Sequence, residues 1–408
     1  MDTITHGIAG ALMGKSLFGG RDLVTKGSLT RQRIVTWALM LGAIFPDSDV
    51  IRDMLSRDSM LILTWHRSIT HSFVCLPLWA LLLAALTRWV ARWRKWETPS
   101  FAALAALYGI GILSHIVLDL VTSFGTMIWS PLNWSRPAWD LLFIIDLTFS
   151  AILLLPQLLA WINADAEKAK SRMLLIAVLT LPLPFLISIF SQNVGAPIST
   201  LTVIVMTLLL AAFLLLPVVT GSGARVSYVA WNRAGFLAAC LYVVAALVAH
   251  RDALQRVQKF AAFEHLQVDA IGALPFPPSL WHWDGLVRTP HGVYEFRTDL
   301  SARPALTIPA QGQMTSTEDS IEYNFYPDAR GNRFIEQARQ LPEVRNVLWF
   351  ARFPVVRFHQ EGGVAIVDFS DLRFPQVRRN RPASFTYRVK IDASGTVLSK
   401  GWLRDRRD

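Results

Sequence analysis

The chain has 408 residues, of which 52% are hydrophobic and 17% charged, and its formal net charge is +10. So apolar and charge-poor a composition excludes an ordinary soluble domain, a disordered chain and a collagen-like fibre. The positive charge is compatible with nucleic acid or a membrane surface as a partner, and the position of the charges decides between them.

Long apolar segments run through the first 250 residues. Six of them approach the roughly 20 residues that a helix needs to cross a bilayer, and they lie at 72–92, 101–120, 139–162, 173–191, 198–219 and 231–250. Two shorter segments come first, at 4–18 and 34–45, the second ending at Pro46. Each of these two is compatible with a span or with a re-entrant helix. We therefore predict a polytopic helical bundle with the lipid bilayer as its partner.

Basic residues are concentrated in particular loops of this bundle. They follow the first short segment, follow the span at 72–92, and recur at 168–172. Lys and Arg favour cytoplasmic loops, so this pattern indicates a multi-pass membrane protein with these loops in the cytoplasm. It places residues 47–71, the chain after 118, and everything beyond 250 on the outer face of the membrane.

Beyond residue 250 the pattern changes and charged residues become denser. Short runs rich in Val, Ile, Phe and Tyr occur at 293–296, 320–326, 346–353, 363–369 and 385–391, separated by Gly, Pro and Asp. These runs predict a soluble β-rich or α+β domain, with one helix at 332–340. The predicted organisation is a metal-site helical domain at 1–135, additional transmembrane helices at 136–250, and an extramembrane domain at 251–408.

Ionisable side chains near the membrane level are concentrated in the first 120 residues. Ionisable groups are costly in hydrocarbon, and they mark function more often there than in soluble proteins. Seven candidate ligands lie at corresponding ends of the first four apolar segments, so antiparallel helices would bring them to one membrane face: His6, Asp47, Asp49, His66, His71, His115 and Asp119. A lone histidine in an apolar run is more often a hydrogen-bonded core residue, but the joint arrangement favours metal binding.

The spacing of these residues supports a common centre. His115 and Asp119 are four apart and so lie on one helical face. Asp47 and Asp49 follow Pro46, and in an extended turn both point the same way. His66 and His71 are five apart, which places His66 in a loop or first turn ahead of the helix.

A set of imidazoles and carboxylates suits zinc best, with manganese or iron as alternatives. Seven ligands exceed the needs of one tetrahedral ion, so we expect two or more divalent ions and a bridging water that attacks an ester or phosphoryl centre. Arg67 would clamp an anionic substrate oxygen, and Arg67 and Asp49 are the candidate catalytic residues. We expect no nucleic-acid partner, because no motif for one is present.

Four stretches carry a family resemblance: Thr5-His6-Gly7 with Gly10, Pro46-Asp-Ser-Asp49, His66-Arg-Ser-Ile-Thr-His-Ser72, and Ser114 to Thr126 with His115, Asp119 and Thr122. They resemble the YdjM-like family of bacterial inner-membrane proteins, described as metal-dependent hydrolases. The resemblance is specific over residues 1–135 and implies metal binding at the seven candidate ligands, with Arg67 and Thr122 nearby. The ligand order is more distantly similar to zinc-dependent phospholipases C and single-strand nucleases, whose N-terminal amine ligand has no evident counterpart in this sequence.

The sequence thus predicts a membrane-bound, metal-dependent hydrolase of an amphiphilic, lipid-like ester or phosphoester. One alternative is a metal-binding transporter, which ligands at several membrane depths would favour. Another is a structural or regulatory membrane protein, which a coordination set filled entirely by protein would favour. The sequence predicts neither the substrate's identity nor the oligomeric state.

Overall fold

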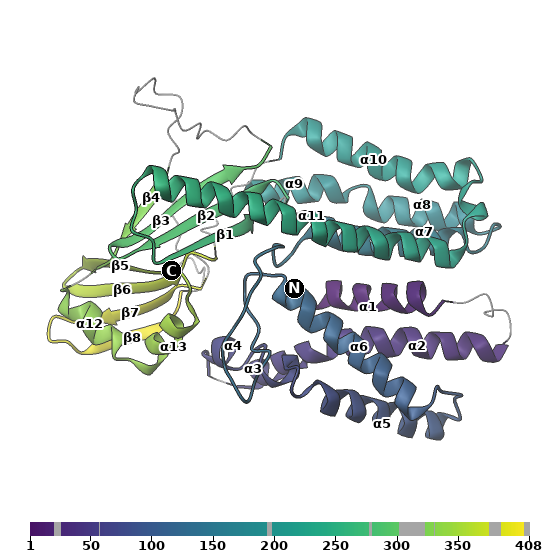
Figure 1. Ribbon diagram of the computed structural model, residues 1–408, viewed down its shortest axis with the longest axis horizontal. Helices are drawn as coiled ribbons and strands as arrows, with labels where there is room; N and C mark the ends of the chain where they lie inside the picture. The colour runs from purple at the N-terminus through teal and green to yellow at the C-terminus, as the bar shows by residue number, and fades with distance from the viewer. Residues whose placement is uncertain are drawn as a thin grey trace.

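The computed structural model describes residues 1–19, 26–56, 58–193, 198–276, 280–301, 323–329, 331–374 and 385–403. Helices occupy the chain as far as residue 263, and two sheets with two short helices follow (Figure 1). This architecture confirms the predicted fold class, a membrane-type helical bundle joined to a C-terminal α+β domain.

The bounds of the helices in the bundle are α1 (Thr3–Leu17), α2 (Lys26–Ile44), α3 (Val50–Leu55), α4 (Leu61–Thr64), α5 (Leu76–Arg94), α6 (Phe101–Leu120), α7 (Leu147–Asn163), α8 (Ala169–Thr180), α9 (Leu183–Asn193), α10 (Thr200–Val219) and α11 (Tyr228–Phe263). Two 3₁₀ turns, η1 (Phe45–Asp49) and η2 (Ile69–His71), interrupt them near the candidate site. Short polar side chains fix several helix starts, since Asp2, Ser100 and Asp146 each accept a hydrogen bond from the first turn of the helix that follows.

The bundle is organised around α1, α2 and α6. Helix α1 packs against α2, α7 and α11, while α6 packs against α2 and α5. Glycines allow α2 and α6 to touch: a Cβ on Gly42 would lie 2.9 Å from the carbonyl oxygen of Tyr108, and one on Gly111 would lie 2.6 Å from that of Leu39. The close approach brings the C-terminal ends of these two helices together, where several candidate ligands lie.

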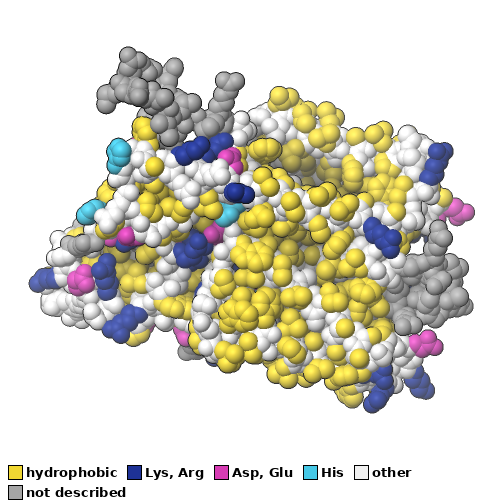
Figure 2. All heavy atoms as spheres, in the orientation of Figure 1, with side chains coloured by type: hydrophobic (Ala, Val, Ile, Leu, Met, Phe, Trp, Pro, Cys, Tyr) yellow, Lys and Arg dark blue, Asp and Glu magenta, His cyan; other side chains and the backbone are white. Residues whose placement is uncertain are grey.

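Several of the described helices are long and apolar enough to cross a membrane. They are Arg33–Leu55, Phe101–Leu120, Ala169–Ile189, Thr200–Val219 and Tyr228–Phe263, and the pair Leu61–His71 and Leu76–Arg94, bent by 71°, adds one if it forms a single span. Figure 2 shows hydrophobic side chains covering most of the helical part, with charged side chains gathered at its far end and over the C-terminal domain.

One predicted span needs correction, and one of the two shorter segments belongs to a longer element. The segment 34–45, expected to be a span or a re-entrant helix, lies within the candidate span Arg33–Leu55, which α2, η1 and α3 form together. The predicted span 139–162 is too long: α7 begins at Leu147, where Asp146 caps it, and has 17 residues. The residues ahead of it form a loop in which Leu141 and Leu142 are buried in the protein core.

The C-terminal domain contains two four-stranded antiparallel sheets. The first has the order β1 (Ala270–Phe276), β2 (His282–Thr289), β3 (Gly292–Asp299) and β4 (Tyr323–Pro327). The second has the order β5 (Pro354–Glu361), β6 (Val364–Asp371), β7 (Tyr387–Ile391) and β8 (Val397–Trp402). Helices α12 (Arg333–Arg339) and α13 (Pro342–Phe350) pack against β6.

The helix predicted at 332–340 is α12, but the strand predicted at 346–353 is wrong, because most of that run belongs to α13. Pro342 occupies the first turn of α13, where its missing N–H has no cost. Val344, Val347 and Phe350 recur every three residues and are all buried. A short apolar run of this kind does not distinguish a helix from a strand by composition.

The C-terminal domain is attached to the bundle in two places. Helix α11 continues past residue 250, and its Val257 and Phe260 pack against the first sheet. The second sheet and its helices share a core with Met60 and Leu63, at and in α4, and with Phe124, in the loop after α6. These residues are close in the chain to η2 and to the end of α6, so the C-terminal domain packs beside the segments that carry the candidate site.

Candidate metal centre

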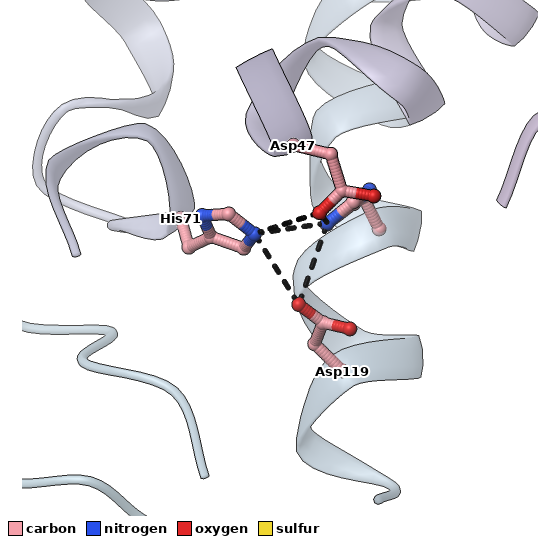
Figure 3. A group of neighbouring side chains, drawn as sticks. Asp47, His71 and Asp119 are labelled. Atoms are coloured by element: carbon pink, nitrogen blue, oxygen red, sulfur yellow. Dashed lines mark hydrogen bonds and ion pairs between the residues drawn. The ribbon is translucent and has the colours of Figure 1, made fainter. Parts of the chain in front are cut away.

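Four of the candidate ligands converge on one point: Asp47 of η1, His71 at the end of η2, and His115 and Asp119 of α6. One ligand atom from each lies within 4.8 Å of all the others. The Nε2 atoms of His71 and His115 are 3.0 Å apart, and Asp119 Oδ2 lies 3.3 Å from the first and 3.4 Å from the second. Figure 3 shows Asp47, His71 and Asp119 pointing toward one another around this point.

These separations fit a metal ion of the size of zinc. Ligand atoms about 2.0 to 2.1 Å from a tetrahedral ion are about 3.4 Å apart. Asp47 Oδ1 is 3.4 Å from His115 Nε2 and 3.6 Å from His71 Nε2, so five of the six separations among the four ligand atoms lie between 3.0 and 3.6 Å. Two imidazoles and two carboxylates are also a donor set that zinc, manganese and iron accept.

Local structure explains how α6 and η1 supply these groups. His115 and Asp119 are one helical turn apart on α6, as predicted, and both are fully buried. Pro46 lies in the first turn of η1 and helps to end α2, so that Asp47 turns toward α6. The predicted extended turn at Asp47 and Asp49 is therefore wrong, because these residues form a 3₁₀ turn.

Hydrogen bonds on the far side of each imidazole fix which nitrogen faces the centre. His115 Nδ1 lies 2.6 Å from the carbonyl oxygen of Ala43, which can only accept a hydrogen bond, so Nδ1 carries the proton. His71 Nδ1 lies 3.0 Å from Thr70 Oγ1 and 3.5 Å from Asp49 Oδ2. Both Nε2 atoms can then present a lone pair to an ion, as supporting hydrogen bonds do in metal sites.

The two carboxylate oxygens of Asp119 have different surroundings. Its Oδ1 is 3.0 Å from Arg67 Nη2 and 3.1 Å from His6 Nε2, and it also contacts the amine of Met1. Its Oδ2 is buried and has no hydrogen-bond partner among the described residues. A buried, unpartnered carboxylate oxygen is costly unless something cationic approaches it, so Oδ2 is a good position for a metal ligand.

The other predicted ligands lie around this centre rather than at it. His6 stacks on His115 with 3.6 Å between ring centroids and bonds to Asp119. His66 Nδ1 lies 2.9 Å from Asp49 Oδ1, and the side chain of His66 remains 17% exposed. The structure therefore brings four of the seven candidates within ligand distance of one point, with His6, Asp49 and His66 as neighbours.

Arg67 links these neighbours to the centre. Its backbone N–H donates to Asp49 Oδ2 at 2.9 Å, and its guanidinium contacts Asp119 and donates to Thr122 Oγ1 at 3.2 Å. Its φ of 61° is in the left-handed region, which is uncommon for a residue other than glycine. The turn at Arg67 thus directs its backbone N–H to the carboxylate of Asp49 and its guanidinium to the carboxylate of Asp119.

The sequence did not indicate three further residues that support this turn: Phe124, Arg136 and Arg373. The ring of Phe124 lies between the guanidinium groups of Arg67 and Arg136, with 4.9 and 5.0 Å from its centroid to their Cζ atoms. Arg136 donates to the carbonyl oxygens of Leu63, His66 and Gly125.

Burial and the charges of Arg67 and Arg373 lower the pKa of Arg136 to about 9. Arg373 of the C-terminal domain donates to the carbonyl oxygens of Ser123 and Phe124. The sequence gives no sign of this role for Arg136 and Arg373, because they contact the site through backbone carbonyls that lie far away in the chain.

No curated protein and no solved structure matches the chain. One protein-family model does, and it covers residues 1–193, the part that contains all four converging residues. Together with the apolar helices, this match identifies a membrane protein. Residues 1–193 are similar to the family described as YdjM inner membrane protein.

Proposed function

We propose that this protein is a multi-pass inner-membrane hydrolase that uses a divalent metal ion to cleave an ester or phosphoester of an amphiphilic substrate. The observation that carries the proposal is the convergence of Asp47, His71, His115 and Asp119, whose ligand atoms are spaced for one ion. Among the described residues, the buried Oδ2 of Asp119 has no hydrogen-bond partner. The family description adds the inner membrane as the location. The geometry favours one ion over the two or more that the number of candidate ligands suggested.

A bound divalent ion supplies a Lewis acid and lowers the pKa of a coordinated water. Two other groups near the centre suit a hydrolytic reaction. Arg67 places a buried positive charge beside Asp119, where it can hold an anionic oxygen of the substrate. Asp49 orients His66 through Nδ1, and the partly exposed ring leaves its Nε2 able to exchange a proton with water or a leaving group.

The main alternative is a structural metal site. Four protein ligands would fill a tetrahedral zinc ion, and closed sites of that kind are structural, whereas catalytic zinc keeps a position for water. Hydrolysis at this centre requires an ion with five or six positions, as manganese and iron accept. The transporter alternative is less well supported, because the four converging residues lie at one end of α2, α5 and α6 instead of along their length.

The test combines metal content, coordination and activity of the purified full chain. We expect about one zinc, manganese or iron per chain by elemental analysis, and release of product from a phosphoester or lipid ester. His71→Ala should lose both the metal and the activity, whereas Asp165→Asn, in the loop between α7 and α8, should retain both. Hydrolysis that persists in metal-free His71→Ala would contradict the proposal. Metal bound without hydrolysis, and with a four-coordinate cobalt spectrum, would support the structural alternative.

The periplasmic position of the centre and of the C-terminal domain is part of the proposal. It rests on the concentration of basic residues in the loops at the other end of the helices. Alkaline phosphatase fused after the last residue should be active, because that enzyme requires the periplasm, and an active cytoplasmic reporter at the same position would reverse the orientation.

A further inference from the structure

Helix α3 turns its apolar side toward the outside of the molecule. Val50, Ile51, Met54 and Leu55 are all exposed, with exposed fractions of 81% for Met54 and 83% for Leu55. At about 100° per residue these four positions cover about 140° of the helix, so they form one continuous face. None of the six residues of α3 is buried.

The polar side of α3 faces the other way. The guanidinium of Arg52 stacks on the ring of Trp65, with 3.9 Å from Cζ to the ring centroid, and Asp53 follows it on that side of the helix. A surface helix of a water-soluble domain turns its apolar face to the core and its charges to water. Helix α3 instead leaves its apolar face exposed while Arg52 stacks on Trp65, and an exposed apolar face is stable where the surroundings are themselves apolar.

The position of α3 agrees with lipid surroundings. Together with α2 and η1 it forms the candidate span Arg33–Leu55, so its exposed face continues the lipid-facing surface of that span. Figure 1 places α3 and α4 at the end of the bundle that is nearest to the C-terminal domain. Six helical residues rise about 9 Å. Leu55 therefore lies at this end of the span, and Asp49, at the start of α3, lies deeper in it.

A shallow groove, mostly open to the outside, lies beside α3 and is lined by Ser48, Ile51, Arg52, Leu55 and Ser56. Its lining has two chemical parts. Ile51 and Leu55 supply an apolar wall, whereas Arg52 supplies a positive charge next to the hydroxyl groups of Ser48 and Ser56. Ser48 lies between Asp47 and Asp49 in the chain, so the groove reaches the turn that carries these two candidate ligands.

We propose that α3 is immersed in the bilayer near its boundary with water, and that this groove seats an anionic bilayer lipid, its acyl chain along Ile51 and Leu55 and its head group at Arg52. The substrate then reaches Asp47 and Asp49 from the lipid phase, since the centre is deeper than the end of α3. An amphipathic helix that lies at a lipid surface buries its apolar face in the same way. The identity of the lipid as a substrate rests on the proposed function, whereas the immersion of α3 does not.

The immersion is tested with a nitroxide spin label at Met54→Cys, in the full chain with Cys75→Ser and Cys240→Ser, reconstituted in phosphatidylcholine and phosphatidylglycerol vesicles. We expect molecular oxygen to relax this label more strongly than a water-soluble nickel complex. Leu209→Cys on α10, also exposed, gives the lipid-facing reference, and Leu398→Cys on β8 gives the aqueous one. A label at Met54 that matches Leu398 would overturn the proposal, whatever the enzyme activity.

The seating of a lipid is tested with two phosphate esters: dioleoyl phosphatidic acid in vesicles, and soluble 4-nitrophenyl phosphate. For Ile51→Ser with Leu55→Ser we expect KM for the vesicle substrate to rise about tenfold, equivalent to about 1.4 kcal/mol of binding, with no change for the soluble ester. The matched control is Leu398→Ser. Equal effects on both esters would overturn the seating. Failure of the wild-type chain to hydrolyse either ester would count against the proposed function, while the spin-label result still decides the position of α3.

Discussion

Arg67 binds one oxygen of Asp119 and leaves the other to the imidazoles. Its Nη2 lies 3.0 Å from Oδ1, while Oδ2 lies 3.3 Å from His71 Nε2. Because the guanidinium holds Oδ1, the carboxylate cannot turn Oδ2 away from the centre without losing a buried ion pair. This arrangement separates two functions of one side chain, orientation through Oδ1 and metal binding through Oδ2.

The first prediction concerns Asp119→Asn. The amide keeps the size of the side chain but has no negative charge, so we expect metal affinity to fall by at least about 100-fold, the upper range for loss of a supporting group in a metal site. Zinc competition with a fluorescent chelator measures this change. Asp165→Asn is the control, and metal affinity within twofold of wild type in Asp119→Asn would show that Oδ2 is not a ligand.

The second prediction separates the neighbours from the converging residues. His66→Gln should retain the bound metal, because His66 lies outside the set of four, but should lower kcat by about 100-fold through loss of proton transfer. His115→Gln should lose the metal. Elemental analysis and a rate measurement on the same preparations check both results. Loss of metal from His66→Gln would restore the larger ligand set that the sequence predicted.

The third prediction concerns the contact between the bundle and the C-terminal domain. Phe124 is buried in the core that it shares with the second sheet and lies between two guanidinium groups. Phe124→Ala should lower the free energy of unfolding by about 3 to 5 kcal/mol, as expected for loss of a buried aromatic ring. Phe325→Ala on β4, where the ring is exposed, is the control. Thermal unfolding in detergent measures both, and equal Tm values for the two variants would contradict the assignment of Phe124 to this core.

The fourth prediction is a pH dependence of the C-terminal domain. Burial, opposed by nearby Arg297, raises the pKa of Asp284 on β2 to about 7. The folded state therefore holds this proton more tightly than the unfolded state, so stability is greatest below about pH 4, falls as the pH rises toward 7, and is lowest above it. Asp284→Asn should remove this dependence and raise stability at pH 8 by a few kcal/mol at most. The Tm of wild type and of Asp284→Asn, measured from pH 4 to 8, checks this direction. A wild-type Tm that rises with pH relative to the Tm of Asp284→Asn would contradict the prediction.

The fifth prediction tests the close packing of α2 and α6. A Cβ on Gly111 would meet the backbone of Leu39 and Ala43, which cannot rotate away. Gly111→Ala should therefore separate the two helices and destabilise the protein by about 1 to 3 kcal/mol, and it should weaken metal binding through the lost contact of His115 with Ala43. Gly109→Ala, where a Cβ would have ordinary contacts of 3.7 Å, is the control. Unchanged stability and metal affinity in Gly111→Ala would show that the helices tolerate separation.

The sequence by itself determined the fold class, most of the apolar spans and the pairing of His115 with Asp119, because helix length and helical spacing are local properties of the chain. It also limited the candidate ligands to a short list. Only the tertiary structure decided that Asp47 and His71 join that pair while His66 bonds to Asp49, because these contacts depend on how η1, η2 and α6 meet across the bundle. The strand predicted at 346–353 failed for a related reason: a short apolar run fits either element until its packing partners are in place. The contribution of Arg136, through backbone carbonyls of remote loops, likewise appears only once the chain is folded.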